Sequence, residues 1–143
     1  MQNMTFEKVA VLLVDDDDQL LESVTKCLNL HDKYDISVAT SAEVAFDTLL
    51  NNRCDVIVCD IKMPVINGLD FLKKLRDEDN KIPFIVFTVT DDKQTVLKAF
   101  NLGANGFVGK YGKPETVFST LERCIGEVVN ASKKIETNIL DVT

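Results

Sequence analysis

The sequence predicts an α/β fold in which five β-strands alternate with five α-helices around one parallel sheet. Short continuous apolar runs, as at residues 9–14 and 56–59, are typical of strands buried on both faces. Each run is followed by a stretch whose apolar residues recur at helical spacing, which indicates a covering helix. Strands that alternate with helices in this way predict a doubly wound sheet joined by right-handed crossovers.

The element boundaries are marked by residues with specific roles at helix ends. Ser41 is suited to cap the second helix, the fourth is expected to stop at Gly103, and Pro114 suits the first turn of the fifth. Apolar residues keep helical spacing beyond the fifth helix, so we divide the chain into a domain at 1–130 and a helical extension at 131–143. Three interpretations of the extension are open: a frayed chain end, a helical linker toward a further domain, or part of a dimer interface. The predicted strands occupy residues 9–14, 34–39, 56–59, 84–89 and 106–109.

Composition excludes several classes of protein. A formal net charge of −7 argues against a nucleic-acid-binding surface, which requires clustered Lys and Arg. No apolar run approaches the length of a membrane span, and the first eight residues lack a signal segment. The cysteines show neither CxxC spacing nor a histidine at zinc-site spacing, which predicts reduced thiols in a cytoplasmic protein. They are Cys27, Cys54, Cys59 and Cys124.

Acidic residues follow two of the predicted strands. Asp15 and Asp16 end the first strand, and Asp60 ends the third. Parallel strands place such residues at one edge of the sheet, where carboxylates about 4 Å apart repel by about 4 kcal/mol at an effective dielectric constant of 20. A small oxygen-seeking cation such as Mg²⁺ removes this repulsion, which predicts a magnesium site. Asp17 and Asp18 are interpreted as turn or helix-cap residues.

The same edge carries groups suited to phosphoryl transfer. A carboxylate such as Asp60 can attack phosphorus to form an acyl phosphate, with Lys110 supplying positive charge and Thr88 a hydroxyl donor. A rival interpretation is an aspartate-based phosphohydrolase that uses Asp15 and Asp17. Such enzymes normally need a cap domain or longer insertions, for which this chain has little room.

Four motifs together identify a resemblance. The chain resembles the response-regulator receiver domain (CheY-like) of two-component signalling over residues 8–130. The resemblance implies a flavodoxin-like fold with strand order 2-1-3-4-5, and a phosphorylation switch rather than a metabolic enzyme. The motifs are VLLVDDDD at 11–18, DVIVCDIKMPVINGLDFL at 55–72, PFIVFT at 83–88 and GANGFVGK at 103–110.

The resemblance also implies roles for the acidic residues. Asp60 corresponds to the phosphoacceptor, which a sensor histidine kinase phosphorylates in this family. Asp15 and Asp16 correspond to the pair that holds Mg²⁺ together with Asp60, and the backbone carbonyl of Lys62 is expected to complete the protein ligands. Lys110 corresponds to the lysine that pairs with the phosphoryl group.

Two further residues correspond to the family's conformational switch. Thr88 matches the hydroxyl that moves to bind the phosphoryl group, and Phe107 matches the aromatic residue that turns inward with it, although Phe107 also suits a plain core position. The surface that changes is expected at residues 90–125, toward a downstream protein or an output domain outside this chain. Two other interpretations are open. The chain forms a homodimer, or it is a receiver-like interaction module that is never phosphorylated.

Three departures from the family pattern concern the chemistry of this edge. The residue after the switch threonine is usually small, but here it is Val89, whose added methyl groups are expected to narrow access to the phosphoryl group. The lysine is often followed by a proline, but here Tyr111 follows, which predicts a differently shaped loop. Lys62 and Thr90 occupy positions that tune the lifetime of the phosphoryl group.

Overall fold

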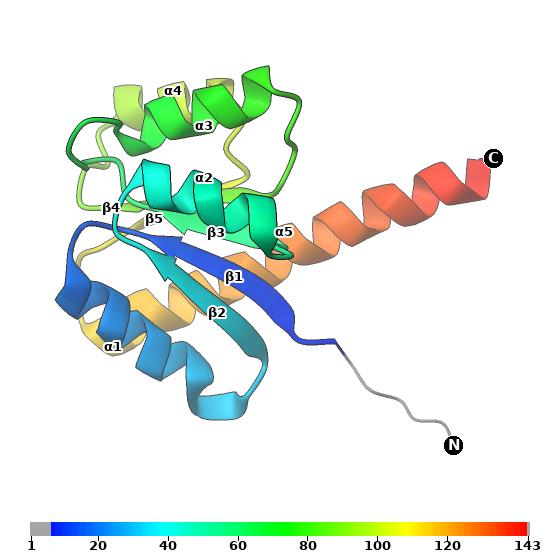
Figure 1. Cartoon of the computed structure of the whole chain (residues 1–143). Coiled ribbons are helices and arrows are strands. Elements are labelled where there is room, and N and C mark those ends of the chain that lie inside the picture. Colours follow the sequence, from blue (N-terminus) through cyan, green and yellow to red (C-terminus); the bar gives the residue numbers. More distant parts are fainter. Residues whose placement is uncertain (1–6, 143) are drawn as a thin grey trace.

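Five parallel strands form one sheet in the order β2-β1-β3-β4-β5 in the computed structural model (Figure 1). The structure describes the backbone of residues 7–142 and the side chains of residues 7–135. The predicted fold and strand order are confirmed. The strands are β1 (Val9–Val14), β2 (Tyr34–Ala39), β3 (Val56–Cys59), β4 (Phe84–Thr88) and β5 (Gly106–Gly109). The helices are α1 (Asp18–Leu28), α2 (Ala42–Asn51), α3 (Gly68–Asp77), α4 (Lys93–Asn101) and α5 (Pro114–Val142), with a 3₁₀ turn η1 (Asn29–His31) after α1.

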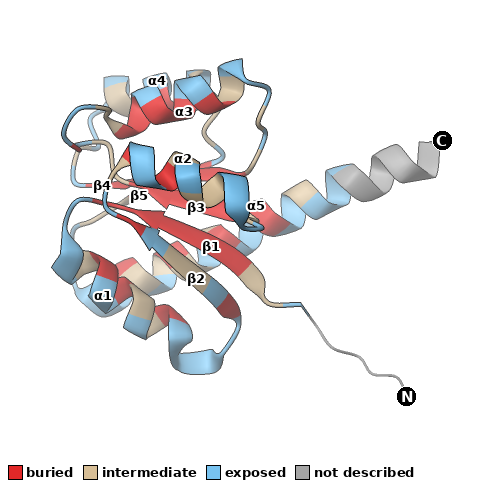
Figure 2. Ribbon diagram, in the orientation of Figure 1, coloured by how far each residue is buried: buried red, intermediate tan, exposed pale blue. Residues whose placement is uncertain are grey.

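The sheet separates two apolar layers. Helices α1 and α5 cover one face, and α2, α3 and α4 cover the other (Figure 1). Alternate residues of β1 serve the two layers, because successive side chains of a strand point to opposite faces. Val11 and Leu13 pack toward α1 and α5, whereas Leu12 and Val14 pack toward the other three helices. Figure 2 accordingly shows the strands mostly buried and the outer sides of the helices exposed.

Helix caps use residues singled out in the sequence. Asp17 caps α1, and its carboxylate accepts a hydrogen bond of 3.1 Å from the amide of Leu20. Ser41 caps α2 in the same way through the amide of Val44, at 3.2 Å. Both interpretations are confirmed, since each side chain satisfies an amide that has no partner inside its helix.

Helix α5 runs without interruption from Pro114 to Val142. Its first part packs against the sheet through residues that include Leu121, Ile125 and Val128, and the helix then continues past the sheet (Figure 1). At a rise of 1.5 Å per residue, the 29 residues span roughly 43 Å. Within the described part of the chain, no helix combines the length and apolar character needed to cross a membrane.

Candidate phosphoacceptor and metal site

Three carboxylates converge beyond the carboxyl ends of β1 and β3. Asp15, Asp16 and Asp60 each offer an oxygen, and these oxygens all lie within 4.8 Å of one another. The sheet fixes this convergence, because Val14 pairs with Cys59 and the amide of Asp60 donates to the carbonyl of Val14 at 3.0 Å. Asp15 is buried and the side chain of Asp60 is only 12% exposed, whereas Asp16 faces solvent.

Lys110 supplies a positive charge to this cluster. Its Nζ lies 2.5 Å from Oδ2 of Asp15 and 3.2 Å from Oδ2 of Asp60. The ammonium also lies 5.4 Å from the centre of the Phe87 ring, and the amide of Lys110 donates to the carbonyl of Thr88. One ammonium therefore contacts two of the three carboxylates, which leaves the cluster with an excess of negative charge.

The carboxyl group of Asp15 responds to this environment. Burial raises its pKa above the ordinary value, and the negative charge of Asp60 adds to that increase. Hydrogen bonds from Lys110 and from the amide of Asp17 lower the pKa in part. Two negatively charged neighbours in a buried setting favour a further cation, and oxygen ligands are the ones that Mg²⁺ prefers. The donor set therefore fits the predicted metal.

The side chains of Thr88 and Lys62 lie near the carboxylates and have other neighbours. Thr88 is fully buried at the end of β4, where its Oγ1 accepts a hydrogen bond of 3.4 Å from the amide of Thr90. Lys62 is exposed and, with Asp16, lines a cavity of about 490 Å³ beside the carboxylates. Phe107 is half-buried on β5 and packs against the layer of α2, α3 and α4. The structure thus brings Asp15, Asp16, Asp60 and Lys110 into direct proximity, with Thr88 on the strand between β3 and β5.

Comparison with known proteins defines the family. Residues 11–122 match the family model described as the response regulator receiver domain. The chain belongs to this family. The receiver domain is similar to a nitrate/nitrite response regulator protein homolog of Haemophilus influenzae, at 28% identity over 138 residues, which are 96% of this chain and 66% of that relative. It is also similar to response regulator SaeR of Staphylococcus aureus, at 33% identity over 103 residues, 72% of this chain and 45% of that relative.

Solved structures agree with this assignment. Chemotaxis response regulator CheY4 of Vibrio cholerae matches with a TM-score of 0.73 and 28% identity, covering 82% of this chain and 99% of that one. The receiver domain of Francisella response regulator 1452 matches with a TM-score of 0.79 and 22% identity, covering 87% and 99%, and this likeness shows the fold alone. The chain spans about two thirds of the Haemophilus relative and less than half of SaeR.

Gly68 is a residue of the receiver domain whose role the sequence analysis missed. It opens α3, and a Cβ atom at this position would collide with the backbone carbonyl of Asp60. Its amide donates to the carbonyl of Ile61 at 2.8 Å, and Asn67 caps the helix through the amide of Asp70. Any side chain at position 68 would displace the backbone of Asp60, so glycine keeps Asp60 in this position. The Asn-Gly pair before an apolar helical stretch was the available signal.

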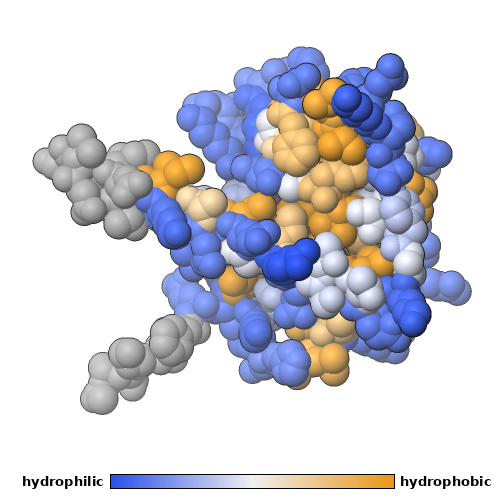
Figure 3. Space-filling model, turned by 180° about the vertical axis from the view of Figure 1, so that it is seen from behind, coloured by the Kyte–Doolittle hydropathy of each residue, from blue (hydrophilic) through white to orange (hydrophobic). Residues whose placement is uncertain are grey.

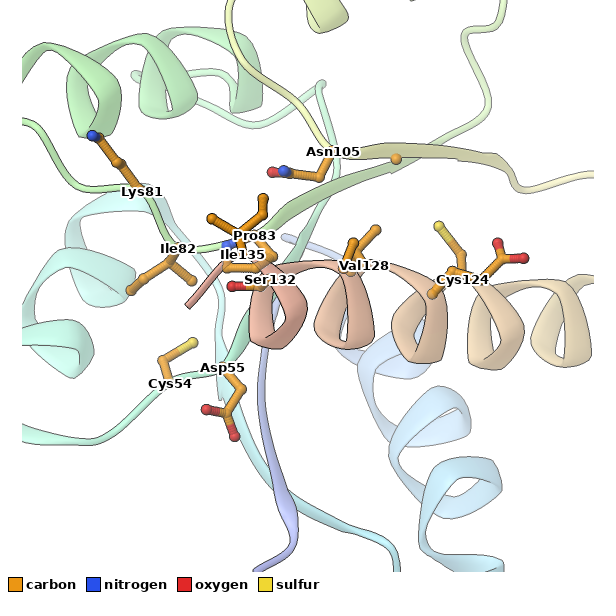
Figure 4. Close-up of a pocket in the computed structure, with 13 residues that line it drawn as sticks. Cys54, Asp55, Lys81, Ile82, Pro83, Asn105, Cys124, Val128, Ser132 and Ile135 are labelled. Carbon is orange, nitrogen blue, oxygen red and sulfur yellow. The ribbon is translucent and has the colours of Figure 1, made fainter. Parts of the chain in front are cut away.

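A larger cavity lies elsewhere in the receiver domain. It measures about 860 Å³ and lies between α5 and the amino ends of β3, β4 and β5 (Figure 4). Its lining includes Cys54, Pro83, Cys124 and Ile135. Burial raises the pKa of Cys54 to about 11 and also raises that of Cys124, so both thiols stay protonated at neutral pH. All four cysteines are free, as predicted.

Proposed function

We propose that this receiver domain is a phosphorylation switch in which Asp60 accepts a phosphoryl group. Asp15, Asp16, Asp60 and the backbone carbonyl of Lys62 would hold Mg²⁺. The observation that carries the proposal is the convergence of three carboxylates, with oxygens within 4.8 Å of each other, two of which also contact the ammonium of Lys110. When bound, Mg²⁺ supplies positive charge to the carboxylates and to the incoming phosphoryl oxygens.

The residues of the site divide the chemical step among them. One Asp60 oxygen attacks the phosphorus of a phosphohistidine on a sensor histidine kinase, or of a small acyl phosphate. The new O–P bond forms as the old P–N or P–O bond breaks, and the leaving group keeps that electron pair. Lys110, now 3.2 Å from Asp60, pairs with a phosphoryl oxygen of the product. The domain thereby assists its own phosphorylation without turning over a metabolite.

Thr88 and Phe107 change position in response to the phosphoryl group. The hydroxyl of Thr88 leaves the amide of Thr90 and donates to a phosphoryl oxygen, and Phe107 follows it inward. This shifts the population between two conformers of residues 90–125. Figure 3 shows apolar surface on the side that carries α4, where Leu97 and Phe100 are exposed. This face suits a downstream protein or an output domain.

Incubation with acetyl phosphate and Mg²⁺ tests the proposal. We expect one phosphoryl group per chain, stable in acid and labile in base, and no adduct when EDTA removes the metal. Beryllofluoride with Mg²⁺ is expected to produce the same conformational response. Absence of both effects would contradict the switch and leave a receiver-like interaction module, whereas sustained turnover of a phosphate ester would favour a phosphohydrolase.

Val89 is expected to slow phosphoryl exchange. It follows Thr88 directly, lies outside β4 and is 56% exposed. Val89→Ala removes two methyl groups, so we expect phosphorylation by acetyl phosphate and loss of the phosphoryl group to become several-fold faster. Both rates can be followed by intact-protein mass spectrometry. Val44→Ala, which trims an exposed valine of α2, is the matched control, and equal rates in all three proteins would exclude steric restriction by Val89.

A further inference from the structure

The apolar stripe of α5 does not end where the sheet ends. Ile125 and Val128 belong to the part that packs against the sheet, and they are 1% and 8% exposed. Ile135 continues the stripe one turn and more beyond, and its side chain is 60% exposed. Ile139 follows at the same spacing in the sequence, and the backbone stays helical as far as Val142. The stripe therefore extends beyond the part of the helix that its own domain covers.

The stripe repeats with the period of a coiled coil. Its members lie alternately four and three residues apart, and this 3.5-residue repeat keeps one side of a helix against a partner helix. The members are Leu121, Ile125, Val128, Ser132, Ile135, Ile139 and Val142. Polar residues such as Asn130, Lys133 and Lys134 occupy the opposite side of the helix. The repeat indicates that the partner of the extension is another helix.

The cavity of about 860 Å³ lies beside the same stripe (Figure 4). Val128, Ser132 and Ile135 line it from α5, whereas Ile82 and Pro83 line it from the segment before β4. The stripe thus borders a hollow with apolar walls at the amino edge of the sheet. Exposed apolar surface beside such a hollow is typical of an interaction site.

We propose that this surface binds the α5 extension of a second copy of the chain, with the two helices antiparallel. A pairing that sets Ile135 opposite the partner's Ser132 also sets Val128 opposite position 139 and Ile125 opposite position 142, so stripe positions meet throughout. The antiparallel direction brings the end of each helix to the cavity of the other copy. A second copy is the occupant because both sides of this pairing come from one stripe, which makes a closed two-fold contact.

The dimer is independent of the proposed function, because none of these residues belongs to the candidate phosphoacceptor site. We expect sedimentation equilibrium to show a concentration-dependent dimer without Mg²⁺ or a phosphodonor. Ile135→Asp is expected to weaken the dimer at least about 100-fold, since both copies lose a buried isoleucine. Phosphorylation by acetyl phosphate is expected to remain unchanged in this variant. Leu50→Asp, at a residue of α2 that is 82% exposed, is the matched control and is expected to dimerise like the wild type.

Ser132 provides a test in the opposite direction. It is the one polar member of the stripe, so Ser132→Ile is expected to tighten the dimer about tenfold by burying an added side chain against the partner's Ile135. Asn130→Ile adds the same side chain on the exposed opposite side of α5 and is expected to leave the association unchanged. Equal tightening by both variants would show unspecific association and overturn the stripe as the interface.

The thiols of the cavity report the direction of the helices. Cys54 and Cys124 line the cavity, whereas Cys27 lies on α1. In the antiparallel dimer the partner helix covers the cavity, so alkylation of Cys54 and Cys124 by N-ethylmaleimide is expected to slow as the protein concentration rises, while that of Cys27 stays constant. Peptide mapping by mass spectrometry measures each rate.

Three results would overturn the proposal. They are a wild-type protein that stays monomeric at its highest soluble concentration, a dimer that survives Ile135→Asp, and a dimer in which the alkylation rates of Cys54 and Cys124 do not change. The first result would leave the extension as a linker or a frayed chain end. None of the three would affect the phosphorylation switch.

Discussion

Replacement of Asp60 by asparagine is expected to abolish Mg²⁺-dependent phosphorylation by acetyl phosphate. The amide of asparagine is a poor nucleophile toward phosphorus, and the change also removes one of the three carboxylates proposed to hold Mg²⁺. The fold is expected to persist, because asparagine has nearly the same shape and still offers an oxygen to the amide of Ile61, which now donates to Asp60 at 2.8 Å. Intact-protein mass spectrometry after incubation measures the loss directly.

Asp17→Asn is the matched control for this loss. The carboxylate of Asp17 is occupied in capping α1, and asparagine caps helices equally well, so phosphorylation is expected to remain at the wild-type level. An unchanged adduct on Asp60→Asn would place the acceptor elsewhere. A loss confined to Asp17→Asn would favour the phosphohydrolase interpretation, in which Asp15 and Asp17 form the acidic pair.

Replacement of Lys110 by methionine is expected to destabilise the metal-free protein by about 3 kcal/mol, the usual cost of removing one partner from a buried ion pair. The side chains of Lys110 and Asp15 are only 11% and 5% exposed, so solvent screens the remaining carboxylates poorly. Mg²⁺ binds the same carboxylates and is expected to recover about 2.7 kcal/mol at 100 times its dissociation constant. Urea denaturation with EDTA and with Mg²⁺ measures both effects.

Lys73→Met supplies the comparison for the lysine replacement. Lys73 and Asp77 form an ion pair of 2.6 Å on the surface of α3, with side chains 60% and 62% exposed. Surface pairs of this kind contribute less than about 1 kcal/mol, and neither Mg²⁺ nor EDTA is expected to alter the result. Similar small losses in both variants, with no response to Mg²⁺, would show that Lys110 does not neutralise the cluster.

The fold was largely predictable because its strands are buried on both faces. The continuous apolar runs marked the core strands, and their ends located Asp15, Asp60 and Lys110 at one edge. Val89 shows the limit of this reasoning. Its apolar character extended the predicted fourth strand by one residue, whereas β4 ends at Thr88 and Val89 is exposed. Hydropathy alone does not distinguish a buried residue of a strand from an exposed apolar residue that follows it.

The sequence predicted which residues form the candidate site better than it predicted the contacts between their side chains. Residue type and strand position identified the carboxylates, while the pairing of Lys110 with Asp15 depends on how the strand ends converge in space. The role of Gly68 likewise depends on how closely α3 approaches the backbone of Asp60, a tertiary distance that no local pattern contains.

The unbroken length of α5 has a mechanical consequence. The segment from Leu121 to Val142 forms a rod roughly 30 Å long at 1.5 Å per residue, and only its beginning packs against the sheet. A tilt of roughly 5° at the packed end would displace the far end of a straight helix of this length by roughly 3 Å. A helix held only at its beginning would in this way turn a small local rearrangement into a larger movement at a distance.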